Sequence, residues 1–86
     1  MYSLDFLKKK IQKRFYNYVS RRQDILPKLE RLKADPRRAL DAHPLDRELE
    51  GSWSCWLSSN LRMVYLIDDE QEKILVLTIG THNAVY

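Results

Sequence analysis

Glycine, proline and cysteine are scarce in this chain of 86 residues, which contains two glycines, three prolines and one cysteine. With Gly and Pro below their usual shares of about 7% and 5%, the chain shows no low-complexity tract and no domain boundary. One cysteine cannot form an internal disulfide, and with only two histidines it cannot build a zinc site. We therefore expect one small domain over residues 1–86, without metal or cofactor, in a reducing compartment such as the cytoplasm.

Long apolar runs are also missing. No run approaches the ~20 residues that cross a membrane, and the N-terminus lacks the apolar core of a signal peptide. Hydrophobic residues nevertheless make up 44% of the chain, which argues against intrinsic disorder.

Charge is distributed unevenly along the chain. Residues 1–38 contain 12 Lys and Arg against four Asp and Glu, whereas residues 39–86 contain three against eight. The net charges of the two parts are therefore +8 and −5. A basic part of this kind is suited to a polyanion such as a nucleic acid, and the alternative is that these cations only solvate outer helix faces.

The first 19 residues predict a helix over 4–19. Its apolar residues recur every three or four positions and share one stripe: Leu4, Leu7, Ile11, Phe15 and Tyr18. Ser3 is a suitable N-cap for such a helix. The competing interpretation is a short strand over 2–6, because Tyr2, Leu4 and Phe6 alternate with polar residues.

A second helix is predicted over residues 24–34. Asp24 can cap it, Pro27 falls in its first turn, and the buried stripe consists of Ile25, Leu29 and Leu32. Pro36 ends the helix, because the residue before a proline is disfavoured in the α region. Residues 36–46 then form a polar connection.

From Gly51 onward the hydrophobic period changes to two, and strands are predicted over 53–57, 61–67 and 73–79. In the first, Trp53 and Cys55 face the helices, with Cys55 as a small buried apolar residue, and Trp56 faces the other way. Residues 74–77 are apolar on both faces, which places the last strand inside the sheet. The resulting fold class is α+β, an N-terminal helical hairpin packed on a twisted antiparallel sheet of three to four strands.

Four residues are candidates for chemistry: His43, Arg62, His82 and Tyr86. Arg62 opens one strand of the predicted hairpin, and His82 and Tyr86 follow the other, so the three should meet at one end of the sheet. An arginine stabilises charge on a phosphate, a histidine moves a proton, and a tyrosine stacks on a base.

Each candidate also has an ordinary structural explanation. Both histidines suit solvent-facing turns, Arg62 suits an ion pair with Asp68 or Glu70, and Tyr86 suits a place in the core. Motifs for nucleotide loops, Ser-His-Asp triads, HExxH or CxxC sites are absent from the sequence.

Four segments together resemble the RelE/ParE superfamily of type II toxins, over about residues 25–86. They are His43-Pro44-Leu45, Leu49-Glu50-Gly51-Ser52-Trp53-Ser54, Leu61-Arg62-Met63-Val64-Tyr65 and Ile79-Gly80-Thr81-His82-Asn83-Ala84-Val85-Tyr86. The histidine and aromatic tail is more similar to the RelE/StbE, YoeB and YafQ members than to the gyrase-poisoning ParE members.

The resemblance implies a helical hairpin on a twisted antiparallel sheet and a ribosome-dependent, metal-independent cleavage of mRNA. In that mechanism the RNA 2′-hydroxyl attacks the adjacent phosphate and expels the 5′-oxygen. By position, Arg62 matches the phosphate-binding arginine, His82 the acid or base, Tyr86 the aromatic that contacts substrate, and His43 a catalytic glutamate or histidine. The implied partners are the ribosome, mRNA and a cognate antitoxin.

Under this hypothesis the basic helices would bind ribosomal RNA through its phosphates. The residues are Lys8, Lys9, Lys10, Lys13, Arg14, Arg21, Arg22, Arg37 and Arg38.

The chain departs from the family pattern at two places. Cys55-Trp56 stands where many members have a basic residue, and the usual N-terminal strand is absent or reduced to Tyr2–Phe6, which would leave a sheet edge open. The first departure motivates alternative hypotheses: a non-catalytic ParE-like inhibitor of DNA gyrase, or a decayed toxin that only binds its antitoxin. A general nucleic-acid binder built on the basic helices is a further alternative.

Overall fold

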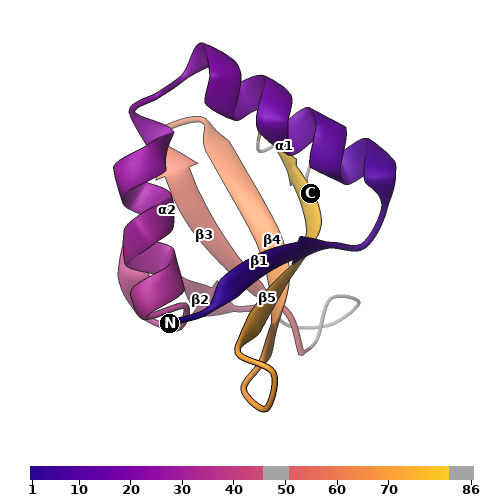
Figure 1. Cartoon of the computed structure of the whole chain (residues 1–86). Helices are drawn as coiled ribbons and strands as arrows, with labels where there is room; N and C mark the ends of the chain where they lie inside the picture. Colours follow the sequence, from indigo (N-terminus) through magenta and orange to yellow (C-terminus); the bar gives the residue numbers. More distant parts are fainter. Residues whose placement is uncertain (46–50, 82–86) are drawn as a thin grey trace.

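A computed structural model describes residues 1–45 and 51–81 (Figure 1). Its elements in chain order are β1 (Ser3–Phe6), α1 (Lys9–Arg21), α2 (Ile25–Ala34), the 3-10 helix η1 (Ala39–Asp41), β2 (His43–Pro44), β3 (Trp53–Ser58), β4 (Leu61–Asp68) and β5 (Lys73–Gly80). The predicted α+β class is confirmed, with α2 and the three long strands close to their expected positions. In the described ranges no helix is both long and apolar enough to cross a bilayer.

The sheet has five strands in the order β1-β5-β4-β3-β2. β1 runs parallel to β5, and the other neighbours are antiparallel, so the sheet is mixed and larger than the predicted three to four strands. The two additional strands have only four and two residues. Such short segments form because a longer neighbour supplies their hydrogen-bond partners, which local sequence patterns do not reveal.

The prediction of a helix over residues 4–19 is wrong at its start. Ser3–Phe6 is a strand that pairs with β5, and the helix begins only at Lys9. Leu4 lies in this strand, and Leu7 is exposed and precedes the helix. Two members of the expected stripe therefore do not belong to the helix. The competing strand interpretation holds instead, and β1 covers the edge of β5 that we expected to be open.

Both helices pack against one face of the sheet (Figure 1). α1 buries Ile11 and Phe15, and α2 buries all three apolar residues of its predicted stripe. Asp24 stands at the N-cap of α2 without a side-chain capping bond, and its carboxylate instead pairs with Arg22 at 3.3 Å. The helix is therefore held by its buried face more than by its cap.

The strand residues facing the helices complete this core. Trp53 packs against the core and Cys55 is fully buried, as predicted. Burial raises the pKa of the Cys55 thiol to about 12, so this cysteine is an inert packing residue. The buried Tyr65 hydroxyl donates a hydrogen bond of 2.7 Å to the Pro36 carbonyl oxygen, which ties the connection after α2 to β4.

A polar clip joins the chain start, the connection after α2 and the β4–β5 turn. Arg37 donates two hydrogen bonds, of 3.0 and 2.8 Å, to the Asp69 carboxylate, and the Tyr2 hydroxyl donates a third. The hydrogen bonds from Arg37, and then that from Tyr2, lower the pKa of Asp69 from 3.8 to about 2.

Asp69→Asn is expected to make the stability of the protein less sensitive to acid between about pH 4 and pH 2. Because the folded-state pKa of Asp69 is depressed, its contribution to stability is complete above about pH 4 and is lost as the pH falls through about 2. The Tm difference between parent and Asp69→Asn should therefore shrink from pH 4 to pH 2 in thermal unfolding scans. Glu70→Gln, in the same turn, is the control; a Tm gap for Asp69→Asn that stays constant over this window would contradict the clip.

Candidate functional site

Arg62 is the centre of the candidate site, at the start of β4. Its neighbours in the sheet are Trp56 on β3 and Gly80 on β5. The side chain is only 7% exposed, although its strand neighbour Met63 points into the core between sheet and helices. Strand alternation therefore directs Arg62 to the opposite face of the sheet, where it is buried as well.

Two polar side chains hold the guanidinium in place. Arg62 Nη2 lies 2.9 Å from Ser54 Oγ and 2.9 Å from His43 Nε2. Ser54 and His43 are register partners on β3 and β2, so both reach the same face as Arg62. The expected alternative, an ion pair with Asp68 or Glu70, is excluded: Asp68 stands six residues further along β4, about 20 Å away by strand geometry, and Glu70 lies in the turn beyond it.

The contact with Arg62 also decides the tautomer of His43. A guanidinium can only donate, so Nε2 must accept, and the ring proton lies on Nδ1. Nδ1 is 3.3 Å from the Pro44 carbonyl oxygen, a suitable acceptor. His43 is otherwise exposed, so a basic nitrogen stands at the surface beside a buried cation.

Trp56 contacts the guanidinium of Arg62 with its aromatic ring. The Arg62 guanidinium carbon lies 4.2 Å from the centre of the Trp56 ring, a close cation–π contact. Trp56 is half-buried, on the opposite face from Trp53, as predicted. The indole thus orients Arg62 through its ring, while Ser54 and His43 hold the Nη2 atom.

Sequence reasoning paired Arg62 with His82 and Tyr86 and did not foresee its contact with His43. β5 does end opposite Arg62, as the hairpin prediction required. His82 and Tyr86 lie outside the described residues, so their roles stay predictions. The role of Ser54 was also missed, although the alternation of residues 52–56 already placed it on the face of Trp56.

The predicted RNA-binding cations are spread over α1, its two ends and the connection after α2. Some are already engaged within the protein. Arg37 belongs to the clip with Asp69, Arg22 bonds to Ser58 at 3.0 Å, and Arg14 approaches the Ile79 carbonyl oxygen at 3.5 Å. The three lysines that precede or open α1, Lys8, Lys9 and Lys10, are exposed.

Comparisons with known proteins show that the fold of this chain is similar to that of several solved structures. No protein-family model and no curated protein sequence matches the chain. The toxin–antitoxin complex RelBE2 from Mycobacterium tuberculosis contains a similar chain, with TM-score 0.73 and 24% identity over 94% of this chain and 91% of that one.

Two further structures are similar. The heterotetrameric YoeB–YefM toxin–antitoxin complex from Staphylococcus aureus has TM-score 0.74 and 17% identity over 95% of this chain and 98% of that one. YafQ from Escherichia coli has TM-score 0.70 and 15% identity over 100% and 99%. The resemblance noted in the sequence is thus matched at the level of structure, and the chain has the fold shared by RelE-, YoeB- and YafQ-type toxins.

Proposed function

We propose that this protein is the toxin of a type II toxin–antitoxin system and cleaves ribosome-bound mRNA without a metal ion. The observation that carries the proposal is the contact between Arg62 and His43 above the Trp56 ring. It joins a cation suited to a phosphate with a nitrogen that can move a proton. Neighbours with the same fold come from toxin–antitoxin complexes, which supports the toxin role.

The reaction is an internal transesterification. The 2′-oxygen attacks the adjacent phosphorus, the bond from phosphorus to the 5′-oxygen breaks, and the products carry a 2′,3′-cyclic phosphate and a 5′-hydroxyl. A base must take the 2′-hydroxyl proton and an acid must protonate the leaving 5′-oxygen. The negative charge that grows on the phosphate oxygens needs a fixed cation.

We assign Arg62 as the cation that stabilises the negative charge on the phosphate oxygens. Ser54 and the Trp56 ring hold the guanidinium before substrate binds, and both contacts can remain when a phosphate oxygen replaces His43 as its partner. In the free protein, Arg62 occupies the lone pair of His43 Nε2. A phosphate oxygen that takes over the Arg62 donor frees Nε2 to accept the 2′-hydroxyl proton.

The remaining roles are taken from the resemblance to the RelE/ParE superfamily. We assign His82 as the acid that protonates the 5′-oxygen and Tyr86 as the aromatic that orients the nucleotide. If the RNA strand bound in the opposite direction, His43 would be the acid and His82 the base. The pH–rate profiles of the two single variants distinguish these assignments.

The proposed partners are ribosomal RNA and an antitoxin. The exposed lysines at the start of α1 are suited to salt-dependent contacts with RNA phosphates. The antitoxin would neutralise the toxin by laying an amphipathic segment against it or by adding a strand at β1 or β2, the outer strands of the sheet.

Induced expression followed by sequencing of RNA 5′ ends tests the activity. The expected result is growth arrest with new 5′ ends inside translated codons, and far fewer of these ends when translation initiation is blocked first. His82→Ala at equal protein level should remove most of the new ends. Intact transcripts with DNA damage would instead support a gyrase inhibitor, and no growth arrest at all would support a decayed toxin.

A further inference from the structure

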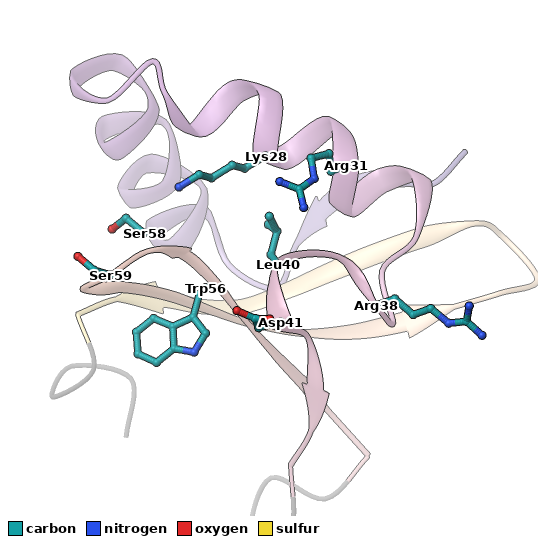
Figure 2. A pocket seen from close by; sticks show the side chains of 8 residues that line it. All are labelled: Lys28, Arg31, Arg38, Leu40, Asp41, Trp56, Ser58 and Ser59. Atoms are coloured by element: carbon teal, nitrogen blue, oxygen red, sulfur yellow. The ribbon is translucent and has the colours of Figure 1, made fainter.

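A second feature of the surface lies beside the candidate site: a hollow of about 550 Å³ between α2, η1 and β3 (Figure 2). We call it the basic hollow, and its lining residues are Lys28, Arg31, Arg38, Leu40, Asp41, Trp56, Ser58 and Ser59. Three of the eight side chains are cationic and one is acidic. Only Arg38 belongs to the cations that the sequence had singled out for RNA.

Two of the cations converge on the hollow from α2. Figure 2 shows Lys28 and Arg31 extending from the helix toward β3, whereas the Arg38 guanidinium points away from them. Lys28 Nζ donates a hydrogen bond of 2.9 Å to the Leu57 carbonyl oxygen, which holds it over the strand. Within residues 1–45 and 51–81, neither Lys28 nor Arg31 forms an ion pair. The positive charge is therefore directed at the hollow and not neutralised by a described carboxylate.

Part of the wall of the hollow is formed by two residues of η1 with an uncommon backbone conformation. Leu40 and Asp41 have φ values of 57° and 55°, in the left-handed region that costs residues with a Cβ about 1–2 kcal/mol each. This turn buries the Leu40 side chain in the core, which offsets the cost, and places Asp41 on the hollow wall. The wall thus combines two cations with one acceptor for an N–H or O–H group.

Trp56 connects the basic hollow with the candidate active site. Its ring contacts the Arg62 guanidinium on the face of β3 away from the helices, and Figure 2 shows this ring on the other side of the strand from Lys28 and Arg31, so Trp56 borders the hollow at the edge of β3. β2 pairs with β3 at Trp53 and Ser54, so no described strand covers the edge of β3 at Trp56. A chain of nucleotides bound with one phosphate at Arg62 can therefore pass the indole around this edge and enter the hollow with its next unit. Aromatic rings bind single-stranded bases by stacking, whatever the base identity.

We infer that the basic hollow binds the nucleotide next to the scissile phosphate, with Lys28 and Arg31 on its phosphate and Trp56 against its base. This inference rests on the proposed function, because it takes single-stranded RNA as the ligand. A base amino group or ribose hydroxyl is the donor that suits Asp41.

Binding of a 2′-O-methyl RNA hexanucleotide tests the inference, because this probe cannot undergo attack by its 2′-oxygen. All proteins carry Trp53→Phe, so Trp56 is their only indole and its fluorescence reports on the hollow. The double variant Lys28→Gln/Arg31→Gln is compared with Lys33→Gln/Lys73→Gln, which removes the same charge outside the hollow. Arg31→Gln alone is included because Lys28 also holds the Leu57 carbonyl oxygen.

The Lys28→Gln/Arg31→Gln protein should bind about tenfold more weakly than its parent, and Arg31→Gln about threefold. The slope of log affinity against log salt should fall by about 1.4 in the double variant, about 0.7 for each lost phosphate contact on a single strand. The control should keep the parent affinity within about twofold. Equal weakening of both double variants, or parent-like binding by the hollow variants, would overturn the inference.

The two hypotheses fail in different ways. Absence of cleavage in cells counts against the proposed nuclease and leaves the probe binding unaffected. Loss of the difference between hollow and control variants counts against the hollow alone, even when cleavage proceeds normally.

Discussion

Arg62→Ala is expected to lower RNA cleavage by at least about 100-fold and to relieve the growth arrest. The guanidinium is the described cation that touches an imidazole and is held by a serine and an indole at the same time. Removing one preorganised donor from developing charge typically costs two to three orders of magnitude. Growth after induction and the yield of new RNA 5′ ends measure the effect.

Arg62→Lys is the matched variant, because it keeps the positive charge but loses the planar group that lies against the Trp56 ring while its Nη2 contacts Ser54 and His43. We expect it to retain a small part of the activity, closer to Arg62→Ala than to the parent. Thermal unfolding of both proteins separates a lost function from a lost fold, since Arg62 is buried. Full toxicity of Arg62→Ala and of His82→Ala at equal protein levels would show that the site is wrongly assigned.

Leu32→Ala is expected to produce a large loss of stability. Leu32 is fully buried in the core between helix and sheet. Replacing such a leucine by alanine costs about 2–5 kcal/mol. A domain of this size has a total stability of about 4–13 kcal/mol, so the change removes a large part of it. In a domain of 60–100 residues this corresponds to a fall in Tm of about 10–30 °C.

Leu26→Ala provides the matched control on the same helix. The leucine is 47% exposed, so the same chemical change removes less apolar surface from the core and leaves no closed cavity. We expect a loss of less than about 1 kcal/mol for this variant in urea unfolding. Similar losses for Leu26→Ala and Leu32→Ala would mean that α2 does not pack on the sheet as described.

The parts of the fold that were predictable have strong local patterns. The stripe of Ile25, Leu29 and Leu32 placed α2 correctly, since a helix of three turns repeats its apolar spacing several times. Alternation placed Cys55 inside and Trp56 on the opposite face, and it placed Arg62 at the start of its strand. The resemblance to known toxins in the second half agreed with the structural comparison.

The misplaced parts have weak local patterns. Leu4 and Leu7 matched the spacing of a helix by coincidence, because β1 finds its hydrogen bonds on β5, about 70 residues along the chain. The two-residue strand β2 has no recognisable pattern of its own, and it exists because it pairs with β3. The contact of His43 with Arg62 depends on this pairing and was therefore not foreseen.

Residue types and their spacing were sufficient for the fold class, the core faces of α2 and β3, and the choice of His43 and Arg62 as candidates. These properties follow from periodic burial and from side-chain chemistry, which are local. The tertiary structure alone decided which candidates meet. β2 brings His43 to Arg62, and η1 forms one side of the hollow that Lys28 and Arg31 also line. Such contacts depend on strand register and on backbone turns between distant segments, and a single-residue shift in register would send each side chain to the other face of the sheet.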